Sequence, residues 1–315
     1  MAFTLSPEAA ASGARVLSYE TIGSTSTEAM ARLRDGEGGP LWVAASRQTA
    51  GRGRRGSVWQ DDGGNLAASL GLRLDLDPAA LATLGFVAGV ATVRALERCR
   101  ASSALSPAGG GSTAKPAGWR GEAAYTRDGA LSGEVGHPTP DLRSDSPPPK
   151  VGEAVRFNLK WPNDVLADGA KLVGILLETE LSAAGRLVVV GIGVNVARAP
   201  EGLAYPAASL QGLGLHVSAA EVFSALTAEW KRAFAIWDMG RGFSAIRQAW
   251  LDHAGGLGGP VTIRSGAAKH ITGTFDTIDT AGQLVLTDAH GARHTVSAGE
   301  VHFGEAATLR PEIAA

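Results

Sequence analysis

The sequence has little of several features that mark common protein classes. It contains one cysteine, Cys99, in 315 residues, so it cannot form an internal disulfide, and the usual sign of an oxidising compartment is missing. The longest apolar run, residues 187–197, is far shorter than the ~20 residues that a membrane-spanning helix needs. Residues 1–14 lack the basic and apolar segments of a signal peptide. We therefore expect a cytoplasmic protein that does not enter a membrane.

An excess of charge of either sign is also missing. Twenty-nine Lys and Arg residues against 31 Asp and Glu residues give a net charge of −2, so any recognition of anions must be local. Glycine, in contrast, is abundant: 42 of 315 residues, or about 13% against a usual ~7%. No Gly-X-Y repeat is present, which excludes collagen, and 44% apolar residues is compatible with a folded globular chain.

Residues 101–154 differ from the rest of the chain. They hold 7 of the 15 prolines, many Gly and Ser residues and almost no apolar periodicity. Such a composition buries too little apolar surface to offset the entropy of ordering, so we predict a low-complexity, disordered insertion. It contains only nine of the 42 glycines. Most of the glycine excess therefore belongs to folded sequence.

The remaining sequence alternates between strand-like and helix-like segments. Apolar runs predict strands at residues 41–47, 66–74, 155–161, 172–181 and 187–196. Capping signals predict helices 29–33, after a box formed by Thr25 and Glu28, and 79–100, after Asp77 and Pro78. Two further helices are expected at 218–238, with Ser218 and Glu221 as the box, and at 243–253.

After the glycine-rich residues 255–259 the pattern changes to short strands separated by turns, at 261–264, 271–276, 283–287 and 293–297. This spacing is typical of a small β barrel or sandwich. The sequence thus predicts an α+β domain over residues 1–255, with a mixed sheet flanked by helices, and a small all-β domain over residues 256–315.

The most unusual segment is the hexapeptide Gly51-Arg52-Gly53-Arg54-Arg55-Gly56. It matches the dinucleotide-binding pattern G-x-G-x-x-G, but that pattern has to open a helix, and residues 57–65 are loop-like. Glycines allow a loop to fold over a ligand, and arginines offer charged, bidentate donors to phosphate or carboxylate. A solvated basic turn or a nucleic-acid contact would have the same composition, so these alternatives stay open.

Three later segments could contribute to a binding site. Lys160, Asn163 and Asp164 end a predicted strand and could bind a metal–phosphate group, although an ordinary turn after an edge strand has the same sequence. Lys171 precedes an apolar strand, where it could fix an anion or extend into solvent. Glycines 191 and 193 lie in a strand before Asn195 and would admit a flat ligand or mark a bulge.

The sequence contains no HExxH, CxxC or G-x-S-x-G motif, and nothing in it supports acyl-enzyme chemistry through Ser or Cys. His290 and His294 are four residues apart, but Gly291 favours a hairpin turn over a metal-binding helix face.

In their order along the chain, these segments resemble the biotin–protein ligases. The resemblance covers about residues 16–196 outside the insertion, and it rests on residues 23–26, 48–56, 59, 160–164, 171–176 and 191–195. It implies a class II synthetase-like catalytic domain followed by a small SH3-like barrel. It also implies a two-step reaction in which biotin and Mg-ATP give biotinyl-5′-AMP, and a lysine of a carrier protein then takes the biotin.

The resemblance also implies roles for individual residues. Lys171, Arg54 and Arg55 would be catalytic. The biotin site would comprise Ser24, Thr25, Gln48, Gly51, Arg52, Arg54, Lys171, Gly174 and Gly191. The ATP site would comprise Arg55, Trp59, Lys160, Asn163, Asp164 and Asn195, with Asn163 and Asp164 serving Mg²⁺.

The implied partner is the biotin carboxyl carrier protein or domain of acetyl-CoA carboxylase or a related carboxylase, with the ligase as a monomer or homodimer. Fifteen residues before Val16 cannot form a helix-turn-helix, so a ligase that does not bind DNA is expected. Ser26 stands where the family often has Asn. Two alternatives remain: a lipoate–protein ligase, which would not usually carry the arginine–glycine loop, and a non-enzymatic nucleic-acid binder, which would need wider basic patches.

Overall fold

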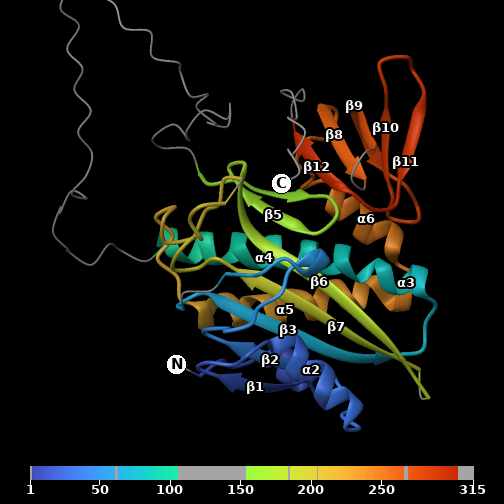
Figure 1. Cartoon of the computed structure of the whole chain (residues 1–315). Coiled ribbons are helices and arrows are strands. Elements are labelled where there is room, and N and C mark those ends of the chain that lie inside the picture. The colour runs from blue at the N-terminus through green and yellow to red at the C-terminus, as the bar shows by residue number, and fades with distance from the viewer. Residues whose placement is uncertain are drawn as a thin grey trace, which may run out of the picture.

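The computed structural model describes residues 2–60, 63–105, 154–183, 185–203, 205–265 and 269–303. These residues form a seven-stranded mixed sheet flanked by helices and a second, five-stranded antiparallel sheet (Figure 1). The α+β class expected from the sequence is therefore confirmed. Most of the predicted insertion, residues 106–153, lies outside the described residues.

The large sheet has the strand order β1-β2-β3-β7-β6-β5-β4, in which β1 and β2 are parallel and all other neighbours are antiparallel. The five predicted strands are confirmed, and two short strands, β1 and β5, escaped the prediction. The bounds are β1 Arg15–Tyr19, β2 Leu41–Ala45, β3 Leu66–Leu74, β4 Phe157–Lys160, β5 Asp164–Ala167, β6 Ala170–Ser182 and β7 Gly185–Val194.

The two faces of this sheet meet different helices because side chains alternate along each strand. Trp42 and Ala44 of β2 belong to the main core, in which helices α4 (Leu84–Leu105) and α5 (Ala219–Trp237) pack against one face. Leu41 and Val43 belong to a second core with α2 (Thr25–Arg34). On the α2 face, Val43 pairs across the strands with Ser69, and Ser69 with Gly191. The small residues Ser69 and Gly191 leave that face hollow beside α2.

The first turn of α2 begins earlier than predicted. Its N-cap is Ser24, whose hydroxyl accepts a hydrogen bond from the backbone N–H of Thr27 at 3.4 Å. The predicted box of Thr25 and Glu28 is wrong: Thr25 lies inside the helix, and the Glu28 carboxylate accepts from Tyr19 and Arg32. The hydroxyl of Thr25 instead makes tertiary hydrogen bonds with the side chains of Gln48 and Ser69.

The predicted helix 79–100 is two helices, a short α3 (Pro78–Ala82) capped by Asp77 and the long α4, with Thr83 between them. The Thr83 hydroxyl donates to the carbonyl of Ala80 and accepts from the indole N–H of Trp237. By length and composition residues 78–104 could cross a membrane, but 72% of the most apolar window is buried against the rest of the chain. A helix in the core of a domain meets the same criterion.

The second sheet has the order β11-β10-β9-β8-β12. Its strands are β8 Pro260–Ser265, β9 Lys269–Ile278, β10 Leu284–Thr287, β11 Arg293–Val296 and β12 Glu300–Phe303, the last of which was not predicted. The remaining elements are α1 Pro7–Ala11, the short 3₁₀ turns Arg54–Gly56 and Asp238–Gly240, and α6 Phe243–Leu251.

The second sheet is joined to the large domain by buried polar and aromatic contacts. The indole N–H of Trp161 donates to the carbonyl of Gly282 at 3.0 Å, and a side chain at Gly282 would collide with Phe86 of α4. Arg247 of α6 donates to the hydroxyl of Thr277. The junction brings β12 close to the hollow face of the large sheet (Figure 1).

Candidate active site

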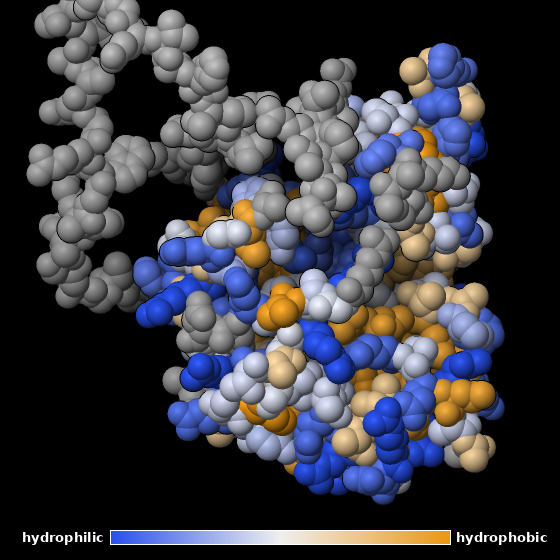
Figure 2. All heavy atoms as spheres, viewed as in Figure 1, coloured by the Kyte–Doolittle hydropathy of each residue, from blue (hydrophilic) through white to orange (hydrophobic). Residues whose placement is uncertain are grey.

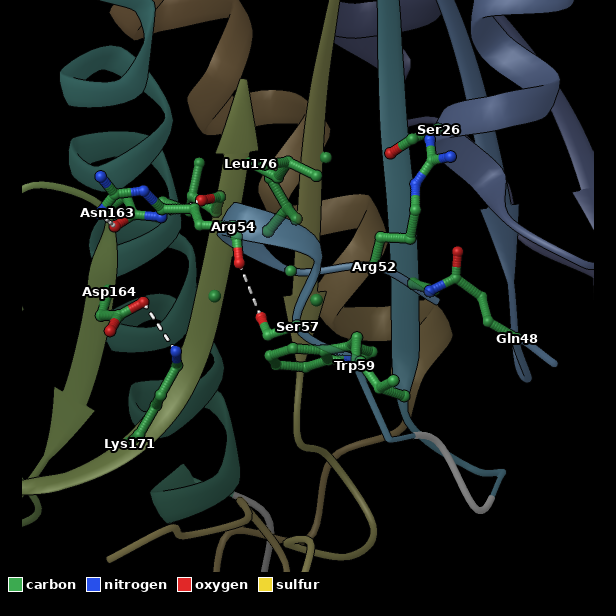
Figure 3. A pocket seen from close by; sticks show the side chains of 18 of the residues that line it. Ser26, Gln48, Arg52, Arg54, Ser57, Trp59, Asn163, Asp164, Lys171 and Leu176 are labelled. Carbon is green, nitrogen blue, oxygen red and sulfur yellow. Dashed lines mark hydrogen bonds and ion pairs between the residues drawn. The ribbon is translucent and has the colours of Figure 1, made fainter. Parts of the chain in front are cut away.

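A cavity of about 640 Å³ opens on the α2 face of the large sheet. Its walls come from the start of α2, the arginine–glycine loop, strands β3, β5, β6 and β7, and the second sheet. Figure 3 shows the loop crossing over β6 and β7, with side chains from both sides pointing inward. Over the visible described surface, hydrophilic and apolar side chains are interspersed rather than separated into two large areas (Figure 2).

One end of the cavity is lined by short, buried polar side chains. The hydroxyl of Ser69 lies 2.8 Å from that of Thr25 and 3.1 Å from that of Ser26. The side-chain oxygen of Gln48 accepts from the backbone N–H of Thr25 at 2.8 Å and from its hydroxyl at 3.1 Å. Because these groups come from α2, β3 and the segment after β2, this end is held by several elements at once.

The other end carries long cationic side chains. The ammonium of Lys171 lies 3.0 Å from the carboxylate of Asp164 and 5.4 Å from the centre of the Tyr205 ring. The Lys171 backbone is fixed to residues 206–208 by two hydrogen bonds, one from its N–H to Pro206 and one to its carbonyl from Ala208. An anion entering here would meet a positioned ammonium beside a carboxylate that it could displace.

The arginine–glycine loop is tied to β6 and to the segment before β5. Arg54 donates to the amide oxygen of Asn163 at 3.1 Å, and Arg52 forms an ion pair of 3.2 Å with Glu178 of β6. The loop is closed internally by hydrogen bonds between the Gly53 N–H and the Ser57 carbonyl and between the Ser57 hydroxyl and the Arg54 carbonyl. Since the Arg52 side chain is about half exposed, its ion pair with Glu178 can break at a low cost in free energy.

Trp59 lies over a pair of glycines in the centre of the cavity. Gly174 of β6 and Gly193 of β7 are cross-strand partners, and a Cβ atom at either would come within 2.8 Å or 2.6 Å of the indole ring. A flat group can therefore lie directly on the two strands only because neither position has a side chain. The group that approaches these glycines here is the indole of Trp59, and the approach of a flat ligand to this strand stays a prediction.

The structure gathers most of the predicted site residues around this cavity. Those that line it are Ser24, Thr25, Gln48, Arg52, Arg54, Trp59, Asn163, Asp164, Lys171, Gly174 and Gly191. Gly51 instead lines an adjoining hollow, where a Cβ atom would lie 2.9 Å from the carbonyl oxygen of Trp59. The side chain of Arg55 lies outside the described residues.

Two predicted ATP-site residues, Lys160 and Asn195, do not line the cavity. The Lys160 ammonium lies 5.6 Å from the centre of the Phe303 ring, and burial lowers its pKa against the opposing effect of Asp164 and Glu300. Asn195 is buried at the end of β7 and donates from its side-chain amide to the carbonyl of Ala208. In this conformation Asn195 positions the segment that holds Lys171.

The predicted magnesium site rests on Asn163 and Asp164. Within the described residues no three His, Cys, Asp or Glu side chains gather as a metal-binding cluster. The site could therefore supply one carboxylate and one amide oxygen, each already beside a cation, Lys171 or Arg54. Such a sparse set of oxygen ligands fits Mg²⁺, which keeps several waters and takes further oxygens from substrate phosphates.

Several lining residues escaped the prediction. Ser69 is a single hydroxyl within the apolar strand β3, and only its cross-strand position opposite Gly191 reveals its place. Arg264 and Glu300 reach the cavity from the second sheet, where they form an ion pair of 2.9 Å. Burial acts to raise the pKa of Glu300, but Arg264 and other neighbouring cations hold it below its usual value.

Comparisons with known proteins agree in both parts of the chain. Residues 20–195 match the model of the biotin/lipoate A/B protein ligase family, and residues 256–304 match the biotin protein ligase C-terminal domain. The chain is 37% identical over 290 residues to a biotin–[acetyl-CoA-carboxylase] ligase from Paracoccus denitrificans, covering 89% of this chain and 97% of that protein. A protein of the same name from Mycobacterium tuberculosis is 29% identical, with 89% and 85% covered.

Among solved structures, the chain is similar to a biotin protein ligase from Aquifex aeolicus in complex with biotin and ATP. The TM-score is 0.62 at 21% sequence identity, and the superposition covers 91% of this chain and 97% of the other. This likeness concerns the fold.

Proposed function

The chain belongs to the biotin/lipoate A/B protein ligase family, and from this premise we propose that it attaches biotin to a lysine of a carrier protein in a reaction that consumes ATP. The observation that carries the proposal is the cavity itself. It joins a buried end of hydroxyl and amide groups, suited to a polar ring, to a cationic end suited to a carboxylate and a phosphate.

The reaction has two steps. In the first, an oxygen of the biotin carboxylate attacks the α-phosphorus of ATP, and the bond to pyrophosphate breaks, which leaves biotinyl-5′-AMP. In the second, the amine of the carrier lysine attacks the acyl carbon, AMP leaves, and the nitrogen loses a proton. Neither step needs a nucleophilic side chain of the enzyme, in agreement with the absence of a Ser or Cys motif from the sequence.

The protein has to bring two anions together in the first step. Lys171 is the residue best placed for this, because its ammonium lies in the cavity beside Asp164 and exchanges that carboxylate for the biotin carboxylate. Arg54 offers a second cation on the loop. Fixed donors of this kind stabilise the charge that develops in a transition state by about 3–4 kcal/mol each.

Mg²⁺, when bound, neutralises charge on the polyphosphate. In our proposal Asp164 and Asn163 hold it, and Trp59 packs against the adenine over Gly174 and Gly193. The loop of residues 51–56 covers the adenylate and excludes water, which would otherwise hydrolyse the mixed anhydride. The carrier would be the biotin carboxyl carrier protein or domain of a carboxylase, and we place the reaction in the cytoplasm.

The proposal is tested by pyrophosphate release from ATP and Mg²⁺ with biotin or with lipoate. Biotin-dependent release is expected, and release with lipoate alone would make the chain a lipoate ligase. An apo carrier domain then provides the second test: a streptavidin blot should show labelling of the carrier but not of a variant with its target lysine replaced by arginine. Salt-sensitive oligonucleotide binding without nucleotide turnover would overturn the enzymatic proposal.

A further inference from the structure

Three buried hydroxyl groups form a chain at the polar end of the cavity. Ser69 lies in its middle and is fully buried, Thr25 lies on one side, and Ser26 lies on the other side. Thr25 continues the chain to the side-chain oxygen of Gln48. Each of the three hydroxyls has a single proton to donate, so the order of donors along the chain can be worked out.

The direction is fixed at Gln48. The backbone N–H of Thr25 can act only as a donor, and it lies 2.8 Å from the side-chain oxygen of Gln48, so this atom must be the acceptor. The Thr25 hydroxyl, 3.1 Å from the same oxygen, therefore donates to it as well. Having used its proton, Thr25 accepts from Ser69 at 2.8 Å. Ser69 in turn accepts from Ser26 at 3.1 Å.

Ser26 ends the chain at the cavity. Its proton is engaged by Ser69, so towards a ligand it offers only the lone pairs of its oxygen. The space next to this oxygen is kept open by Gly191, where a Cβ atom would lie 2.8 Å away. A ligand group placed here gains a hydrogen bond only if it brings an N–H or O–H donor.

We propose that Ser69 is a positioning residue that makes Ser26 a dedicated acceptor and thereby selects acids whose ring carries an N–H donor. The inference rests on the proposed function and deepens it. The cyclic urea of biotin has two N–H groups, whereas the dithiolane ring of lipoate has none. A donor-free ring would leave the buried lone pairs of the Ser26 oxygen without a donor, which is a stronger source of discrimination than a difference in size.

The test compares two ligands of the same shape by calorimetry on the full chain. One is biotin, and the other is its cyclic carbonate analogue, in which both urea N–H groups are replaced by oxygen. Wild-type protein should bind biotin more tightly than the carbonate. In Ser69→Ala and in Ser26→Ala the biotin affinity should fall about tenfold, as expected for one buried hydrogen bond, while the carbonate affinity should stay within about twofold.

Thr92→Val is the matched control, because the Thr92 hydroxyl is equally buried but bonds to Ala88 inside α4. It should change neither affinity. A ratio of biotin affinity to carbonate affinity that stays at the wild-type value in both serine variants would overturn the inference. If both affinities fall equally, the serines have a structural role; if neither falls, the hydroxyl chain does not affect binding. If the wild-type protein binds biotin and labels the carrier while the serine variants give either of these results, the inference fails and the proposed function stays intact.

Discussion

The two ends of the cavity are built in opposite ways. At the polar end, Thr25 and Ser69 are short and buried, and neutral hydrogen bonds join them to each other and to the side chain of Gln48. At the cationic end, the side chains of Lys171 and Arg54 are long and are held by the carboxylate of Asp164 and the amide oxygen of Asn163 (Figure 3). The first arrangement is preorganised, and the second can exchange its internal acid for an external anion. Recognition and chemistry are thus separated within one site.

Loss of the central cation should have the largest effect. Lys171→Ala is expected to lower the rate of adenylate formation by about 10²–10³-fold, the scale measured for removal of one transition-state donor. The melting temperature should stay within about 4 °C, the shift that corresponds to ~1 kcal/mol, because the ion pair with Asp164 is partly solvated. Pyrophosphate release measures the rate, and Lys231→Ala, an exposed lysine of α5, is the control. Normal turnover would refute the role of Lys171.

A pair of glycine substitutions on β7 separates the two functions of the cavity. Gly193→Ala places a methyl group 2.6 Å from the Trp59 indole, and Gly191→Ala places one 2.8 Å from the Ser26 oxygen. We expect the first to raise the KM for ATP and the second to raise the KM for biotin, each about tenfold, since overpacking costs about 1–3 kcal/mol. Initial rates with one substrate varied at a time test this. Equal effects of both variants on both substrates would show that the ends are not independent.

Sequence patterns predict best where local interactions decide the structure. Strand β3 has the bounds that its mostly apolar run predicts, and Asp77 and Ser218 cap their helices as their sequences indicate. The N-cap of α2 was predicted one residue late, at Thr25 instead of Ser24, because the hydroxyl of Thr25 bonds to Gln48 and Ser69, a contact that no local pattern reveals.

The same distinction applies to the site. The loop at residues 51–56 and Lys171 stand out because charge and glycine are unusual in their surroundings. Ser69 does not stand out, because it is one serine in an apolar strand. Its place in the cavity is determined by cross-strand neighbours that lie far away in sequence. Arg264 and Glu300 reach the cavity only through the packing of the second sheet, which depends on contacts such as that of Trp161 with Gly282.

Opening the loop should affect retention of the intermediate more than its formation. Arg54→Gly removes the hydrogen bond to Asn163 and is expected to raise the release of free biotinyl-AMP several-fold, because the loop covers the adenylate less completely. Chromatography of the filtrate after single turnover, without carrier, measures the leak. Arg54→Lys keeps the charge but loses the guanidinium fork, so its leak of biotinyl-AMP should lie between that of the wild type and that of Arg54→Gly. Unchanged leakage in Arg54→Gly would mean that the loop does not sequester the intermediate.

The smallest effect should come from breaking the exposed ion pair between Arg52 of the loop and Glu178 of β6. Glu178→Gln removes the partner of Arg52, and an exposed ion pair contributes only about 0–1 kcal/mol, so the leak of biotinyl-AMP should rise at most about fivefold. Glu180 offers a matched control two residues along the same strand, because it pairs with Arg34 of α2 instead of the loop. Glu180→Gln should leave the leak unchanged.

High salt should raise the wild-type leak towards that of Glu178→Gln and change the leak of the variant less, since screening weakens the same ion pair. A leak that depends on neither salt nor Glu178 would assign loop closure to Arg54 and the internal hydrogen bonds of the loop alone, and the loop would then be more rigid than the exposure of Arg52 indicates.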